Sequence, residues 1–284
     1  MSFDWREADD ETIAYHFIPG ITVPGAMDLL GELPGRAEQA RANLAGEIDV
    51  RYGPGPKETF DIFSATSDAK GAPPPAQIFI HGGYWRAMDK SDYSHLATDV
   101  VAAGVTHISL NYDLCPEVTL DTIVAEIKRA VIYIYESASE LGIDAERIYI
   151  AGHSAGGHLT GMMMRQDWTE AGLPKDVFKG AMPISGAFEP EAIMHTAINE
   201  DVRLDLDTAR RNGLLDAPPL VAAPVLAFVG GAEPEGFHSL SEAYVALCED
   251  AQKHSVADAN HFTVLDHIFQ KDGDYFAAMM AEIK

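Results

Sequence analysis

Apolar runs and amphipathic stretches alternate along the chain from about residue 76 onward. Apolar runs without internal alternation are typical of strands that are buried on both faces of a sheet. Six such runs, the last of them weak, lie at 77–81, 106–112, 147–152, 179–185, 224–231 and 254–259. Helical patterns lie between them at 91–103, 119–141, 155–168 and 239–253. Strands that alternate with helices in this way predict an α/β fold, with a mostly parallel sheet covered by helices on both faces.

The first part of the chain has a different pattern. Two short strand-like segments at 47–52 and 58–64 predict an antiparallel edge of the sheet. The rest of residues 1–50 looks helical or irregular, with Pro and Gly predicting breaks at 19–25 and 31–35.

A second departure from the alternation is segment 187–218, which is polar with scattered apolar residues. We interpret it as a small cap inserted between a strand and the next one. The sequence therefore predicts a single domain over residues 1–284, with an N-terminal extension at about 1–46 and a cap at about 187–218.

The net charge of the chain argues against two classes of binding partner. The chain has 20 Lys and Arg against 44 Asp and Glu, so its formal net charge is −24. Such a chain repels the phosphate backbone of nucleic acids and anionic membrane surfaces, so neither is an expected partner. The sequence shows no secretory leader and no apolar run of roughly 18 residues. We expect a cytoplasmic protein that binds a small-molecule substrate, and a homodimer is compatible with the sequence.

The most specific motif is G-x-S-x-G at residues 152–156, with Ser154 at its centre. A predicted strand precedes it and a predicted helix follows it, which is the context of a nucleophilic serine. The glycines on either side remove Cβ atoms that would collide in so sharp a turn. We predict that Ser154 is the nucleophile; the alternative is a glycine-rich helix start that serves only close packing.

A second motif, HGGYW at residues 81–85, follows an earlier predicted strand. Loops of this type form the oxyanion hole of lipases and esterases. We predict that the backbone of Gly82, Gly83 and Tyr84, together with the N–H of Ala155, stabilises a substrate oxyanion. His81 is expected to hold this loop by hydrogen bonds rather than to transfer protons.

The aromatic pair that ends the second motif has two interpretations. Tyr84 and Trp85 either form a wall of the substrate pocket or pack in the core. We assign both to substrate binding, together with His153 beside the nucleophile.

A nucleophilic serine needs an acid and a base, which in this fold follow it in the order Asp or Glu, then His. Glu233 directly follows the strand at 224–231 and is the predicted acid. His261 follows the weak last strand and is the predicted base. The competing residues are Glu235, Asp216 and Asp258 for the acid, and His238, His254 and His267 for the base. Glu235 belongs to the same loop as Glu233, so the choice between these two stays open.

No cofactor and no metal are expected. Cys115 and Cys248 are too far apart in the sequence to indicate a disulfide framework, and both are expected to be free thiols. His153 and His158 do not belong to a group with metal-ligand spacing.

Taken together, these residues resemble the kynurenine formamidase (arylformamidase) branch of the α/β-hydrolase superfamily. HGGYW, GHSAGGH and the order of acid and histidine carry the resemblance, and further segments at 111–121, 184–191 and 236–244 extend it to about residues 50–270. It implies an α/β-hydrolase fold and a cofactor-free serine hydrolase of tryptophan catabolism, which converts N-formyl-L-kynurenine to L-kynurenine and formate. By position it implies Ser154, Glu233 and His261 as the catalytic triad.

Two features depart from that family. Glu233 stands where animal members usually have Asp, and segment 187–218 does not match closely, which leaves the substrate open. The nearest alternative is a carboxylesterase or thioesterase with the same machinery. The alternative from another class is a non-catalytic binding protein of the same fold, and an amidase or peptidase is a further one.

Overall fold

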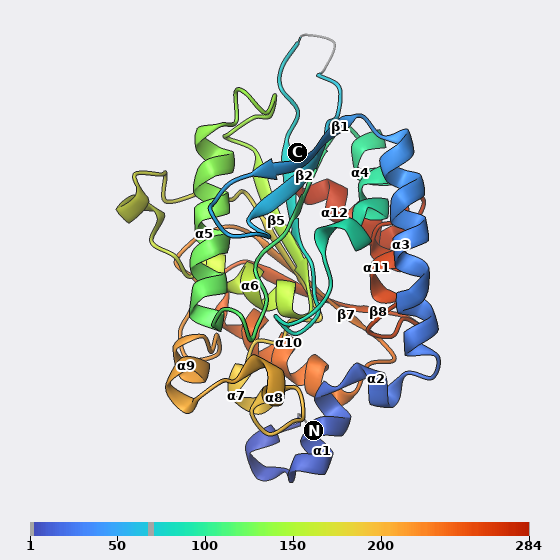
Figure 1. Cartoon of the computed structure of the whole chain (residues 1–284), viewed down its shortest axis with the longest axis vertical. Coiled ribbons are helices and arrows are strands. Elements are labelled where there is room, and N and C mark those ends of the chain that lie inside the picture. The colour runs from blue at the N-terminus through green and yellow to red at the C-terminus, as the bar shows by residue number, and fades with distance from the viewer. Residues whose placement is uncertain (1–2, 68–70, 284) are drawn as a thin grey trace.

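Eight strands form one mixed sheet through the middle of the molecule (Figure 1), and the computed structural model describes residues 3–67 and 71–283. The strands are β1 Gly46–Arg51, β2 Thr59–Phe63, β3 Ala76–Ile80, β4 Thr106–Leu110, β5 Ile148–His153, β6 Ala181–Ile184, β7 Val225–Gly230 and β8 Ala251–Val256. Their spatial order is β1-β2-β4-β3-β5-β6-β7-β8. β1 pairs antiparallel with β2 and β2 antiparallel with β4, whereas all pairs from β4 to β8 are parallel. The predicted mostly parallel sheet with an antiparallel edge is confirmed.

Helices cover both faces of this sheet. They are α1 Asp10–Phe17, α2 Pro19–Thr22, α3 Ala26–Asn43, α4 Ala97–Ala102, α5 Leu120–Glu136, α6 Ala155–Met164, α7 Pro190–Ile193, α8 Asn199–Val202, α9 Leu206–Arg211, α10 Glu235–Leu247, α11 Val264–Ile268 and α12 Asp274–Glu282. Short 3-10 turns at Trp5–Glu7, Lys90–Asp92, Ser94–Leu96 and Trp168–Ala171 complete the described elements.

Two hydrophobic cores result, one on each face of the sheet. Successive side chains of a strand point to opposite faces, and in β5 Ile148 and Ile150 join one core while Tyr149 and Ala151 join the other. The first core also contains apolar residues of α5, α6 and α10, and the second contains those of α4, α11 and α12. Figure 1 shows α5 and α4 on opposite sides of the sheet.

The N-terminal helices correct one prediction. The break expected at 31–35 is wrong, because α3 continues through Pro34 in its interior. A proline costs a helix one hydrogen bond and introduces a local clash, but tertiary contacts hold the part of α3 that follows it. Arg36 pairs with Asp266 at 2.5 Å, and Arg41 donates to the hydroxyl of Ser94 at 3.0 Å.

The position of the last strand, β8, corrects a second prediction. The helix predicted at 239–253 ends at residue 247, and the strand predicted at 254–259 lies at Ala251–Val256. β8 is an edge strand whose residues are mostly half-exposed or exposed, so it lacks the apolar run of a doubly covered strand. Asp258 consequently follows the strand instead of lying within it.

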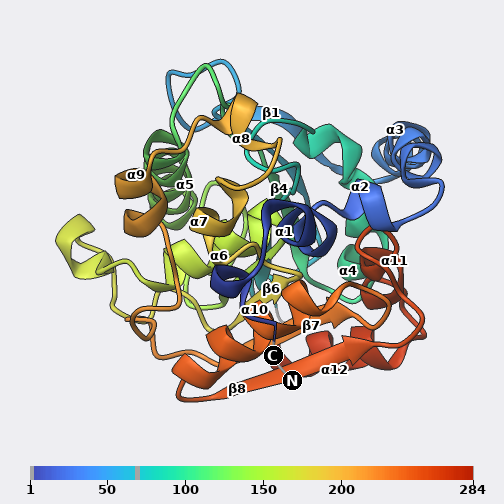
Figure 2. The same ribbon diagram turned by 90° about the horizontal axis from the view of Figure 1, so that it is seen from below.

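Segment 187–218 contains α7, α8 and α9 and contacts the N-terminal part of the chain. Arg6 pairs with Glu189 at 2.7 Å, and His195 lies 3.2 Å from the carboxylate of Asp10. Both views show α1 beside α7 (Figures 1 and 2). The two segments that fall outside the strand–helix alternation therefore meet at one end of the molecule.

Candidate active site

A sharp turn between β5 and α6 presents Ser154. This residue has φ 55° and ψ −115°, a strained conformation for a residue other than glycine. A Cβ added at Gly152 would collide with the carbonyl oxygen of Gly156, and one added at Gly156 would collide with that of Ile80. The two glycines of the motif are thus required by crowding of the backbone around the serine.

A buried acid–base pair lies at the neighbouring strand ends. Nδ1 of His261, on the loop after β8, lies 2.6 Å from Oε2 of Glu233, which follows β7. The other carboxylate oxygen, Oε1, accepts hydrogen bonds from the Ser185 hydroxyl at 2.5 Å and from the Gly230 N–H at 2.7 Å. Ser185 itself follows β6. Three consecutive strands of the sheet therefore fix the carboxylate that faces the imidazole.

Two aromatic rings pack against the His261 imidazole. The ring centroids of Phe237 and His153 each lie 4.6 Å from that of His261. His153 is buried, and neither of its ring nitrogens has a hydrogen-bond partner among the described residues. Burial, and the nearby His261, lower the pKa of His153 well below its usual value, so His153 is neutral.

The loop after β3 approaches the serine closely. A Cβ added at Gly82 would lie 3.1 Å from Cβ of Ser154, so a side chain there would crowd the serine. Within the described part of the chain, the backbone N–H groups of Gly83, Tyr84 and Ala155 donate to no protein acceptor. Unpaired donors grouped beside a serine are the arrangement that stabilises an oxyanion.

The His81 side chain contacts the backbone of the loop after β3 and the strand-end residue Asn111. Its Nδ1 lies 2.7 Å from the carbonyl oxygen of Gly82 and its Nε2 lies 2.9 Å from Oδ1 of Asn111. The ring stacks on Tyr112 with centroids 4.4 Å apart. Burial lowers the pKa of His81 to about 4, which disfavours proton transfer near neutral pH. This geometry fits the structural part expected of His81.

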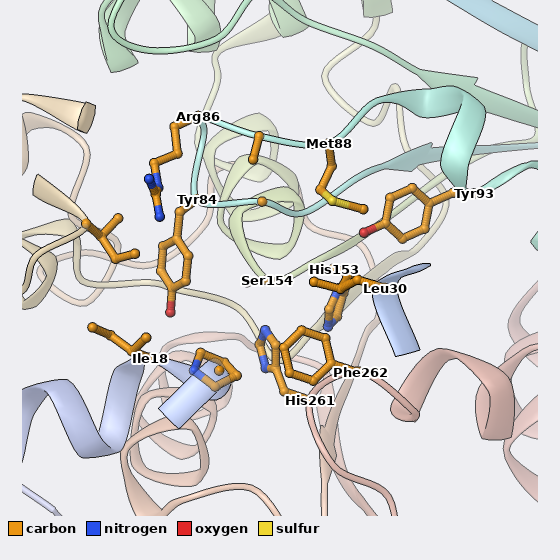
Figure 3. A pocket seen from close by; sticks show the side chains of 15 residues that line it. Ile18, Leu30, Tyr84, Arg86, Met88, Tyr93, His153, Ser154, His261 and Phe262 are labelled. Atoms are coloured by element: carbon orange, nitrogen blue, oxygen red, sulfur yellow. The ribbon is translucent and has the colours of Figure 1, made fainter. Parts of the chain in front are cut away.

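A pocket of about 240 Å³ opens onto Ser154 and His261 (Figure 3). It is mainly apolar, and His153 and Tyr84 both line it. The remaining lining residues are Ile18, Pro19, Gly20, Leu30, Gly83, Arg86, Ala87, Met88, Tyr93, Ile198 and Phe262.

The N-terminal segment contributes more to this pocket than the sequence suggested. Ile18, Pro19, Gly20 and Leu30 line it, whereas Ile198 is the one residue of segment 187–218 that does. The Tyr84 hydroxyl also donates to the carbonyl oxygen of Phe17. The only signal in the sequence was an apolar turn, Ile-Pro-Gly, between two helical patterns, and such turns are too common to indicate a pocket.

The assignment of Trp85 to the pocket wall is wrong in this structure. Its side chain is fully buried, and it is not among the lining residues. The indole packs against the His158 ring at a centroid distance of 5.1 Å. Trp85 thus belongs to the core, and of the aromatic pair it is Tyr84 that lines the pocket.

The competing residues lie elsewhere. Glu235 begins α10, and its carboxylate lies 3.5 Å from the Ser239 hydroxyl. Asp216 pairs with Arg165 at 2.7 Å. Asp258, His238, His254 and His267 make no hydrogen bond or ion pair with His261 or Glu233 in the described chain. The geometry thus favours Glu233 over Glu235 as the partner of His261.

The described residues contain neither a candidate metal site nor a candidate membrane span. No group of three or more His, Cys, Asp or Glu side chains there could hold a metal ion. No helix there is both long and apolar enough to cross a membrane.

Comparison with known proteins places this geometry in a family. Residues 60–185 match the BD-FAE family. Kynurenine formamidase of Salmo salar is 28% identical over 84% of this chain and 81% of its own length, and that of Danio rerio is 26% identical over 95% and 94%. A crystal structure described as a putative thioesterase from Silicibacter sp. TM1040 is 32% identical, covers 98% of each chain and superposes with a TM-score of 0.81. The chain is a kynurenine formamidase-like α/β-hydrolase.

This α/β-hydrolase has the fold that its sequence motifs indicated, and it is a hydrolytic enzyme of the formamidase and esterase type. Parallel α/β sheets carry their sites beyond the carboxyl ends of the strands. Here the loops after β3, β5 and β8 supply the pocket with Gly83, Ser154 and His261, and the loop after β7 supplies Glu233, which contacts His261.

Proposed function

We propose that this hydrolase cleaves small aryl formamides, N-formyl-L-kynurenine among them, through a triad of Ser154, His261 and Glu233. One observation carries the proposal: the buried His261–Glu233 pair, 2.6 Å apart, borders the same pocket as Ser154 and the unpaired N–H groups of the loop after β3. The likeness to the kynurenine formamidases supports the choice of substrate.

The reaction starts at Ser154. Its hydroxyl attacks the formyl carbonyl while Nε2 of His261 takes the proton. Nδ1–H of His261 donates to Glu233, which fixes the tautomer and stabilises the imidazolium that forms. The new oxyanion accepts hydrogen bonds from the unpaired N–H groups of the loop after β3, Gly83 and Tyr84, and from that of Ala155.

Collapse of this intermediate breaks the carbon–nitrogen bond. His261 returns the proton to the leaving aryl amine, and a formyl ester remains on Ser154. Water then attacks the ester with His261 again as the base, and formate leaves. His153 stays neutral beside His261 and adds no second positive charge to the site. We assign His153 and Tyr84 to contact with the substrate.

A second candidate function uses the same residues on esters or thioesters, which the description of the Silicibacter structure favours. The test compares kcat/KM for N-formyl-L-kynurenine with that for p-nitrophenyl acetate. We expect the formamide to be the better substrate, because its leaving group is larger than p-nitrophenol and can contact more of the apolar wall. A formamide value orders of magnitude below the ester value would refute the formamidase proposal and leave the esterase.

Ser185 is expected to position the acid of the triad. Ser185→Ala removes one hydrogen bond to Glu233 and leaves that of Gly230. Hydrogen bonds to charged groups are worth about 1.5–3 kcal/mol, so we expect kcat to fall about tenfold with little change in KM. The matched control is Ser109→Ala, since Ser109, in β4, is also a fully buried serine but its hydroxyl has no partner in the described structure. Equal kcat values for both variants would contradict the proposed role of Ser185 in positioning Glu233.

The organisation of the whole chain is part of the proposal. We propose one α/β-hydrolase domain, in which residues 187–218 and the N-terminal segment together cap the site. We further propose a cytoplasmic enzyme of tryptophan catabolism that acts without a cofactor, as a monomer or a homodimer.

A further inference from the structure

Arg86 is the one lining residue of the pocket with a permanent charge. It follows the oxyanion loop, and its Nη1 pairs with Asp201 of α8. Figure 3 shows its side chain on the same side of the pocket as Tyr84, with His153 and Tyr93 on the other side. A guanidinium thus lies within an otherwise mainly apolar pocket that contains Ser154.

The ion pair leaves much of the guanidinium available. The side chains of Arg86 and Asp201 are 33% and 52% exposed, and pairs this exposed contribute little to stability. An arginine has five N–H donors in a planar fork. Nε and Nη2 of Arg86 have no hydrogen-bond partner among the described residues. The fork therefore has room for a second carboxylate, which guanidinium groups bind in bidentate fashion.

The overall charge makes this arginine informative. With 44 acidic and 20 basic side chains, the protein repels anions at long range. A cation in the pocket offsets that repulsion at the place where a substrate lies. A neutral ester has no use for such a group, whereas a substrate with a free carboxylate does.

We propose that Arg86 binds a carboxylate of the substrate, so that this enzyme selects small amides or esters that carry one. The inference rests on the proposed function and names the substrate class of that same site. Asp201 holds the guanidinium in place when the pocket is empty and shares it when the substrate is bound. Arg86 is then the residue that separates carboxylate-bearing substrates from neutral ones.

The test uses two matched pairs of substrates. In the first pair, N-formyl-L-kynurenine carries a carboxylate on the leaving group and its methyl ester lacks it. In the second pair, mono-p-nitrophenyl succinate carries a carboxylate on the acyl group and its methyl ester lacks it. We expect wild type to prefer the carboxylate in at least one pair. In Arg86→Gln, the ratio of kcat/KM for that carboxylate substrate to kcat/KM for its methyl ester should fall about 10- to 100-fold.

Control variants separate recognition from structure. Arg210→Gln breaks another ion pair of the same cap, with Glu191, at a residue that does not line the pocket, and it should leave the preference intact. Asp201→Asn should keep or increase it. If Asp201→Asn and Arg86→Gln lower kcat/KM for both members of each pair alike, the ion pair is only structural and the proposal is overturned.

A binding measurement distinguishes failure of the carboxylate proposal from failure of the proposed function. Calorimetry measures the Kd of the carboxylate substrate for two inactive variants, Ser154→Ala and the double variant Ser154→Ala with Arg86→Gln. The Kd for the single variant should be about 10- to 100-fold lower than that for the double variant. Equal Kd values, together with normal hydrolysis of p-nitrophenyl acetate by wild type, would overturn the carboxylate proposal alone. If wild type hydrolyses none of the substrates, the proposed function fails and the inference fails with it.

Discussion

Ser154→Ala is expected to lower kcat for both N-formyl-L-kynurenine and p-nitrophenyl acetate by about 10⁶-fold, the loss seen when a serine hydrolase loses its nucleophile. Without the hydroxyl no covalent intermediate forms, and only the oxyanion donors and the binding energy remain. The turn itself does not depend on the hydroxyl, because Gly152 and Gly156 provide its space. The measurement is single-turnover kinetics with both substrates.

Two controls accompany this variant. Its thermal unfolding midpoint should stay close to that of wild type, which shows that the loss is chemical. A fluorophosphonate probe should label wild type at Ser154 and leave the variant unlabelled. An unchanged rate, or labelling of another serine, would refute the assignment of Ser154 and reopen the non-catalytic interpretation of the fold.

His261→Ala should be almost as damaging, with kcat lowered by about 10⁴- to 10⁶-fold. The reason is that Ser154 then has no base and the leaving amine has no acid. Glu233→Gln should cost about 10⁴-fold, because an amide in place of the carboxylate favours the wrong tautomer of His261. The measurement is kcat for N-formyl-L-kynurenine across pH 6–9.

His267 supplies the matched control for the base. It is an exposed histidine on α11, a few residues after His261, so His267→Ala should keep the wild-type rate. A His261→Ala variant that retains more than a tenth of the wild-type kcat would show that another group is the base.

The sheet was predictable from the sequence because its central strands are buried on both faces. β3, β5 and β7 consist of buried residues throughout, so each appears as a mainly apolar run without polar alternation. β8 lies at the edge, where half-exposed positions interrupt the run, and its limits were misplaced by three residues at each end. The continuity of α3 through Pro34 depends on partners such as Asp266, far along the chain, which no local pattern contains.

Some features of the candidate site were also predictable from local sequence, whereas others depend on contacts between distant segments. The sharp turn at Ser154 and the glycine loop were predictable because crowding at strand ends imposes a local sequence pattern on them. His261 had no such pattern and was chosen from its place after the last strand. Ser185 lacked such a pattern, because its contact with Glu233 joins residues 48 positions apart. The burial of Trp85 and the lining position of Ile18 likewise follow from packing between distant segments.

The N-terminal contribution to the pocket has a consequence for how the enzyme is made. The N–H of Phe3 donates to the Ser239 hydroxyl, 236 residues later, and the N–H of Gly236 donates to Nδ1 of His16. Ribosomes add about 5–20 residues per second, so the segment that carries Ile18 leaves the ribosome roughly 10–50 s before its docking surface. A nascent chain that ends before α10 therefore lacks the surface on which this wall of the pocket docks, and it also lacks the proposed base His261. For the proposed triad, hydrolysis can begin only after synthesis has passed both.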